Sequence, residues 1–233
     1  MYEQFFAIPS SACGADGVCM PPFLLGCLEQ TTFADAERIG QGRDYFFQTY
    51  NLCWMLVYTD LTVQAPMSAR AELTVKTRYC GRRGAMLERE LTVFAGGSQT
   101  AYAVQHWVVV DRTARTMCNP MQIPELSGLR APRRDTVRPG RLPDTMRCVG
   151  TGQVTRQDID RNGHMNNARY VERAMPYLPE STLRGTYRLH LTYSYELLEG
   201  QNYDCLCTDG TEPFALVFRN GEKECFALRL MRS

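Results

Sequence analysis

Each half of the chain shows the same order of predicted elements, a helix followed by several strands, and this order constrains the fold more than any other feature. Residues 21–40 begin with two prolines, carry apolar residues at helical spacing and end at a glycine, which predicts a helix. Four segments rich in valine, threonine, tyrosine and tryptophan follow, starting at Cys53, Ala71, Met86 and Thr100. Such segments are typical of β-strands, so the first half is predicted to be a helix and an antiparallel sheet.

The second half repeats this order. A short strand is predicted near residues 147–155, followed by a polar motif and by a helix with apolar residues on one face. Strands are then predicted from Thr186, Asn202 and Phe214, and an Asn-Gly turn folds the last of them back on itself. Because the two halves agree in element order, we expect two units of one plan in the α+β class.

A segment rich in proline and arginine separates the halves. Residues 119–147 contain five prolines and six arginines. Proline interrupts both helical and strand hydrogen bonding, so this segment is predicted to be an extended connection along the surface. The predicted organisation is therefore residues 1–118, a linker over 119–147, and residues 148–233.

Composition excludes several classes of protein. The net charge is +1, so no overall field attracts nucleic acid or an anionic membrane. No segment approaches the roughly 20 apolar residues of a membrane helix, which predicts a soluble protein. The ten cysteines form no CxxC pair and residues 1–11 do not resemble a secretion signal. We therefore expect reduced thiols in a cytoplasm, and no structural zinc site.

The most informative stretch is QDIDRNGHMNNARY, residues 157–170. Asp158, Asp160, Asn162 and Gly163 match positions one, three, five and six of a calcium loop. Position twelve holds Arg169 instead of a glutamate, which argues against calcium. The same residue types are also common in turns and helix caps, so a simple polar connection is a second interpretation.

A catalytic interpretation rests on spacing. Asp160, Asn162 and His164 lie two residues apart, so an extended backbone would turn all three side chains to one side. A helix is predicted directly after them, and its free N–H groups can stabilise negative charge on a carbonyl oxygen. An acid, an amide and an imidazole beside such a site suit the hydrolysis of an activated acyl group.

Three segments resemble one family. DIDRNGHMNNARYVE resembles the signature Asp-x-Asn-x-His-x-Asn-Asn of the acyl-acyl carrier protein thioesterases of bacteria and plants. LTYSYELLEG is similar to that family's second catalytic segment, and Trp107 and Asp111 in TAYAVQHWVVVD match its first-half pattern. The resemblance covers essentially the full chain.

The resemblance implies a tandem hotdog fold, in which two sheets, each wrapped around a long helix, lie side by side. It implies hydrolysis of acyl-acyl carrier protein thioesters to free fatty acid, without metal or cofactor. The second half would hold the active site, and the first half would supply much of the acyl-chain tunnel. The loop before the first helix, ACGADGVCMPP, has no histidine, so we expect one site per chain.

The resemblance also assigns residues. Asp160, Asn162 and His164 match the motif, and Glu196 matches the acid of the second segment. The family often has cysteine after that acid, whereas this chain has Leu197, so a carboxylate mechanism is expected instead of a thiol mechanism.

In the resulting hypothesis, Glu196 acts as general base toward a water molecule that Asn162 and His164 orient, and Asp160 holds those two side chains. Direct attack by the carboxylate to form a mixed anhydride is the alternative. Backbone N–H groups at the start of the second helix would hold the oxyanion, namely those of Asn166, Asn167 and Ala168.

The linker arginines suggest a docking site for the acidic carrier protein, although a solvated linker is the slightly favoured interpretation. The docking candidates are Arg133, Arg134 and Arg138. Alternative functions on the same fold are hydrolysis of acyl-coenzyme A, acyl binding by a sensor, and dehydration of a hydroxyacyl group. Glu196 together with the motif favours hydrolysis. With no organelle transit segment, a bacterial, cytoplasmic enzyme is expected.

Overall fold

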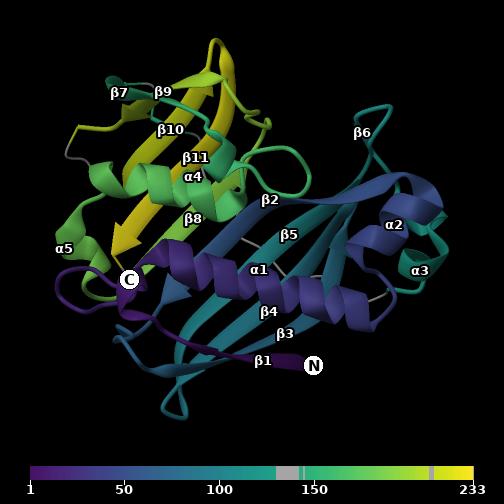
Figure 1. The fold of residues 1–233 in the computed structure, drawn as a ribbon, viewed down its shortest axis with the longest axis horizontal. Coiled ribbons are helices and arrows are strands. Elements are labelled where there is room, and N and C mark those ends of the chain that lie inside the picture. Colours follow the sequence, from purple (N-terminus) through teal and green to yellow (C-terminus); the bar gives the residue numbers. More distant parts are fainter. Residues whose placement is uncertain (130–141, 144, 210–212, 233) are drawn as a thin grey trace.

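The structure, a computed structural model, describes residues 1–129, 142–143, 145–209 and 213–232. Within these ranges, eleven strands form one antiparallel sheet in the order β1-β3-β4-β5-β2-β8-β11-β10-β9-β7, with β6 beside β5 (Figure 1). The first half contributes β1 (Tyr2–Ala7), β2 (Leu52–Val63), β3 (Glu72–Arg83), β4 (Met86–Ala95), β5 (Ser98–Asp111) and β6 (Thr116–Met117). The second half contributes β7 (Arg147–Gln153), β8 (Tyr187–Tyr193), β9 (Asn202–Cys207), β10 (Phe214–Asn220) and β11 (Lys223–Arg232).

The helices are fewer and mostly short. They are α1 (Pro21–Arg38), α2 (Arg43–Tyr50), α3 (Pro124–Ser127), α4 (Asn167–Ala174) and α5 (Glu180–Leu183). Single 3-10 turns are η1 (Ser10–Ala12), η2 (Pro120–Gln122), η3 (Arg156–Asp158) and η4 (Met175–Tyr177). The long α1 lies across the sheet of the first half, and α4 lies above it against the second half (Figure 1).

The predicted first helix is confirmed, and its limits have local causes. Pro21 occupies the first helical position, where a missing N–H costs nothing. Leu24 and Leu28, one turn apart, are buried against the sheet with exposed fractions of 1% and 0%. The helix ends at Arg38, and Gly40 then takes a φ of +72°, a conformation that favours glycine.

The two halves share one sheet, because β2 pairs with β8. This antiparallel ladder runs from Tyr58 opposite Thr192 to Val63 opposite Tyr187. Across it, the Arg188 guanidinium donates to both carboxylate oxygens of Asp60, with N–O distances of 2.8 and 2.5 Å. The main hydrophobic core also spans both halves. The two sheets expected from the sequence are therefore joined edge to edge in one.

The second helix differs from the long one that was expected. The α4 helix has eight residues, and the chain continues as the 3-10 turn η4, which includes Pro176. Proline has no backbone N–H and cannot form an α-helical hydrogen bond, which explains the end of α4 at this point. The α4 helix of the second half packs against the α1 helix of the first half.

Two further elements were not predicted. The α2 helix lies where the sequence showed no helical pattern, and residues 119–129 form η2 and α3 where an extended connection was predicted. The physical reason is burial: Ile123 and Leu126 pack with Phe46 of α2 in a small second core. Prolines are tolerated at the first positions of both short helices. Arg133, Arg134 and Arg138 lie outside the described residues.

Candidate active site

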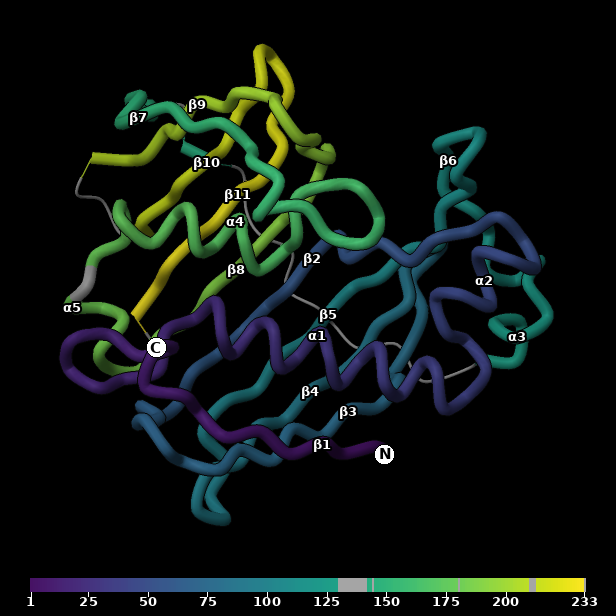
Figure 2. The backbone as a smooth tube through the Cα atoms, viewed as in Figure 1, coloured from purple at the N-terminus to yellow at the C-terminus, as the bar shows by residue number. Residues whose placement is uncertain are grey.

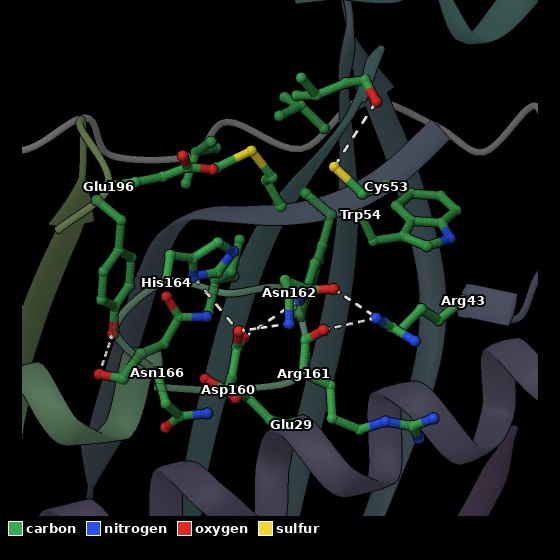
Figure 3. Close-up of a pocket in the computed structure, with 18 of the residues that line it drawn as sticks. Glu29, Arg43, Cys53, Trp54, Asp160, Arg161, Asn162, His164, Asn166 and Glu196 are labelled. Atoms are coloured by element: carbon green, nitrogen blue, oxygen red, sulfur yellow. Dashed lines mark hydrogen bonds and ion pairs between the residues drawn. The ribbon is translucent and has the colours of Figure 1, made fainter. Parts of the chain in front are cut away.

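One large pocket, of about 800 Å³, lies between the two halves and holds most of the predicted site residues (Figure 3). The first half lines it with side chains of α1, β2 and β5, and the second half with the loop before α4 and the chain after β8. Figure 2 shows this loop projecting from the second half toward the first. The predicted residues that line the pocket are Asp160, Asn162, His164, Asn166, Asn167 and Glu196.

The motif loop is a tight turn and not the extended segment that was predicted. The N–H of Gly163 donates to Asp160 O at 3.1 Å, and the N–H of Asp160 donates to His164 O at 2.9 Å. Gly163 has a φ of +86°, which a residue with a Cβ rarely adopts. The turn nevertheless brings the side chains of Asp160, Asn162 and His164 to one pocket, because it folds alternate residues back toward one another.

Asp160 organises this loop. Its Oδ1 accepts the backbone N–H of Asn162 at 2.7 Å, and its Oδ2 accepts Asn162 Nδ2 at 3.2 Å. His164 Nδ1 lies 3.7 Å from Asp160 Oδ2 and 3.3 Å from the carbonyl oxygen of Met165. A carbonyl can only accept, so Nδ1 carries the proton in that contact.

The other end of Asn162 is held by a residue of the first half. Arg43, the first residue of α2, donates Nε to Asn162 Oδ1 at 2.8 Å and a terminal nitrogen to the carbonyl oxygen of Arg161 at 2.8 Å. The Asn162 amide is thus bonded at both ends, which restricts it to one orientation. Sequence reasoning missed Arg43, because no motif marks it.

Glu196 is carried to the pocket by the chain just beyond β8. The predicted strand over this segment ends at Tyr193, so Glu196 lies in irregular backbone. Two hydrogen bonds attach this backbone to the motif: Leu197 N–H donates to the Tyr170 hydroxyl at 3.0 Å, and Met165 N–H donates to Leu197 O at 2.8 Å. Leu197 is itself fully buried. The acid is therefore positioned relative to the motif by its neighbours.

The Glu196 carboxylate forms an ion pair with Arg115, on the turn between β5 and β6. The Arg115 side chain is 65% exposed and that of Glu196 is 15% exposed. Among the described residues, no hydrogen bond joins Glu196 to Asn162 or His164. The four predicted catalytic residues thus share a pocket, with Glu196 bonded to a first-half arginine that the sequence did not indicate.

The predicted oxyanion donors are not equivalent. Asn166 caps α4, and its Oδ1 accepts the Ala168 N–H at 2.9 Å. The Asn166 N–H donates to Asp158 O at 2.8 Å. Two of the three predicted N–H groups are therefore engaged, contrary to the sequence expectation. The N–H of Asn167 is left, since the described part of the chain supplies no acceptor for it.

The calcium arrangement does not form. Asp158, which would be the first ligand, is buried and accepts hydrogen bonds from Arg173 at 2.8 Å and from Thr155 at 2.8 Å. Burial alone would raise the pKa of Asp158, but these partners hold it below its usual value. The described residues contain no group of three or more His, Cys, Asp or Glu side chains suited to a metal ion.

A cysteine does line the pocket, although not at the position where the family often has one. Burial, and next the charge of Glu196, raise the pKa of the Cys53 thiol. The thiol therefore stays protonated near neutral pH and lacks the thiolate that nucleophilic attack requires. No helix in the described part of the chain is long and apolar enough to cross a membrane.

Comparison with known proteins identifies the family of the chain. The model of the acyl-ACP thioesterase N-terminal domain matches residues 1–123, and that of the C-terminal domain matches residues 147–229. No curated protein sequence matches the chain.

Two solved structures share the fold over nearly the whole chain. An acyl-ACP thioesterase from Bacteroides thetaiotaomicron is 19% identical with a TM-score of 0.85, and the alignment covers 98% of this chain and 96% of that one. The 12:0-ACP thioesterase from Umbellularia californica is 18% identical with a TM-score of 0.82, covering 99% and 96%. The predicted tandem hotdog fold is confirmed. From the two domain matches, the chain belongs to the acyl-ACP thioesterase family, and it is a thioester hydrolase.

Proposed function

We propose that the chain hydrolyses acyl-acyl carrier protein thioesters to free fatty acid and carrier protein in the pocket between its halves. One observation carries the proposal: the Asp160 loop and Glu196 line one pocket together with a group of apolar side chains. The apolar lining comes mainly from the first half, including Phe33, Trp54 and Trp107. The acyl chain would lie against these side chains and place the thioester beside the loop.

The chemistry follows from what each group can do. The Asn167 N–H donates to the carbonyl oxygen as it gains charge. Glu196 takes a proton from water as the water oxygen bonds to the carbonyl carbon, and Asn162 and His164 orient that water. The tetrahedral intermediate then expels the sulfur, which receives the proton from Glu196. Fatty acid and free thiol are the products.

Glu196 must leave Arg115 before it can act as the base. An ion pair with so exposed an arginine contributes about 0–1 kcal/mol, so its release adds little to the barrier. The alternative, attack by the carboxylate itself, would give a mixed anhydride. After turnover in ¹⁸O-labelled water, ¹⁸O in the Glu196 carboxylate would establish the anhydride route, because a general base exchanges no oxygen with water in this reaction.

Glu196→Gln tests the assignment of the base. The Glu196→Gln variant should keep its fold, and its kcat should fall about 100-fold or more, because glutamine cannot accept the proton. Thiol release from acyl carrier protein substrates measures turnover, and Glu199→Gln, three residues further on and exposed, is the matched control. Near-normal turnover of Glu196→Gln would remove this residue from the mechanism.

Carrier recognition is a further part of the proposal. We infer that Arg133, Arg134 and Arg138 dock the acidic carrier; charge reversal should then raise KM for carrier-bound substrate and spare small thioesters. Side-by-side turnover of carrier and coenzyme A substrates decides between the two thioester classes. A cytoplasmic location is supported by the ten cysteines, all of which are free thiols.

A further inference from the structure

A second, much smaller cavity lies in the interior of the first half. Its volume is about 20 Å³, room for on the order of one water molecule. Three of the residues that line it are polar and almost fully buried: Thr32 is 4% exposed, Gln41 6% and Arg89 7%. Arg89 donates to Asp35 Oδ2 at 2.6 Å, so the charge beside this cavity is already paired. The cavity is thus part of the packed interior, and its polar lining is unsuited to an acyl chain.

Three aromatic side chains lie between this cavity and the large pocket of about 800 Å³. Phe33 of α1, Trp54 of β2 and Trp107 of β5 line both, and we call these three residues the aromatic partition. The described lining of the small cavity falls within residues 32–129, whereas the large pocket also reaches the motif loop. Figure 3 shows Trp54 on the side of the pocket away from Glu196. The partition is therefore the inner end of the pocket.

Hydrogen bonds and a ring contact hold the partition in one position. The Trp54 indole N–H donates to Gln41 O at 2.9 Å. The Trp107 indole N–H donates to Gln105 Oε1 at 3.2 Å, so the single donor of each indole is used. The Phe33 ring meets the Trp107 ring edge to face, with 5.4 Å between the ring centroids and 70° between the planes, an arrangement that aromatic pairs prefer. An acyl chain therefore meets a fixed wall at this end of the pocket.

We propose that the aromatic partition ends the acyl-binding part of the pocket, and that Phe33 determines the longest acyl chain that the enzyme accepts. This inference rests on the proposed function, in which the thioester lies beside the motif loop. Each methylene group that fits between the loop and the partition is buried and raises kcat/KM about fourfold. A longer chain meets the fixed rings, and behind them only the small polar cavity. Each methylene group beyond this limit therefore lowers kcat/KM about tenfold.

Two substitutions of opposite size at Phe33 test the limit, and neither breaks a hydrogen bond, because phenylalanine has no polar side-chain atom. The assay is thiol release from saturated acyl carrier protein substrates of increasing chain length. Phe33→Ala should move the optimum to chains longer by about two to four carbon atoms, because the neighbours fill only part of the space of the lost ring. The ratio of kcat/KM for the first chain beyond the wild-type optimum to that at the optimum should rise at least about tenfold. Phe33→Trp should move the optimum to shorter chains, because the larger ring occupies part of the pocket.

Phe47→Ala is the matched control, because Phe47 lies on α2 of the same half, is 41% exposed and is absent from the described lining of both cavities. It should keep the wild-type order of chain lengths. An unchanged optimum in both Phe33 variants, a shift of both in one direction, or an equal shift in Phe47→Ala would overturn the inference. Melting temperatures establish that each variant is folded. If Phe33→Ala melts below the assay temperature, Phe33→Leu takes its place, with a smaller shift in the same direction expected.

Binding of free fatty acids separates this inference from the proposed function, because it requires no hydrolysis. Calorimetric titration with saturated fatty acids should show affinity that rises with chain length up to the same limit. The limit should move to longer chains in Phe33→Ala and to shorter chains in Phe33→Trp, and a limit that is the same in both variants would refute the role of the partition. A folded wild-type chain that releases no thiol from any acyl carrier protein substrate would instead refute the proposed function, and fatty acid binding would still decide the role of Phe33.

Discussion

Replacing Arg43 with alanine should impair catalysis although Arg43 belongs to the half without the motif. The substitution removes two hydrogen bonds of 2.8 Å that hold the motif turn, one to Asn162 Oδ1 and one to the Arg161 carbonyl. The Arg43 side chain is 28% exposed, so each bond is partly screened by solvent, and we assign about 0.5–1 kcal/mol to each. The sum of about 1–2 kcal/mol corresponds to a loss of roughly 5- to 30-fold in kcat.

The assay is thiol release at saturating acyl carrier protein substrate, with melting temperature recorded in parallel. Arg161→Ala is the control for lost positive charge at the pocket, because the Arg161 side chain is 80% exposed and its one ion pair among the described residues is with Asp44, at 3.8 Å. It should stay within about threefold of wild type. If Arg43→Ala kept full kcat, or if both variants lost activity equally, the Asn162 amide would not depend on its first-half partner.

Two other substitutions address the contacts between the halves. Arg115→Ala should leave kcat/KM unchanged or raise it up to about fivefold, since it frees Glu196 from an exposed ion pair; a tenfold fall in the same thiol-release assay would instead place Arg115 in catalysis. Burial would raise the pKa of Asp60, but Arg188 and His190 outweigh it and lower the pKa to about 2. Asp60→Asn should therefore cost about 2 kcal/mol at pH 7 in urea unfolding. The difference should vanish as pH falls from about 4 through 2, and a difference that is independent of pH would contradict this assignment.

The sequence predicts elements well where the pattern is local. The first helix, with prolines at its start and a glycine after its end, and the valine- and threonine-rich strands lie close to where they were expected. The alternation of Asp160, Asn162 and His164 predicted an extended segment, whereas a tight turn brings the three side chains to one pocket. A tight turn with glycine at positive φ satisfies the same spacing as an extended strand, and spacing cannot distinguish the two.

The residues that contact the motif and Glu196 are harder to predict from the sequence, because they lie far away along the chain. Arg43 and Asn162 are 119 residues apart, and Arg115 and Glu196 are 81 residues apart. Glu29 lines the pocket from α1, and no motif in the sequence marks it. The register of β2 against β8 determines which side chains of the two halves meet. The residue pattern within either strand does not encode that register.

The pairing of β2 with β8 also determines how the protein could be divided. In the described residues, every other strand pairing joins strands of the same half. Among the described residues, a break in the chain between Ser127 and Arg147 would cut no strand, and it would expose one new β edge on each fragment, that of β2 or that of β8. The two edges match in register, with an arginine on one facing an aspartate on the other. Separately made fragments thus have a template for recombination, and neither would carry a complete catalytic pocket alone.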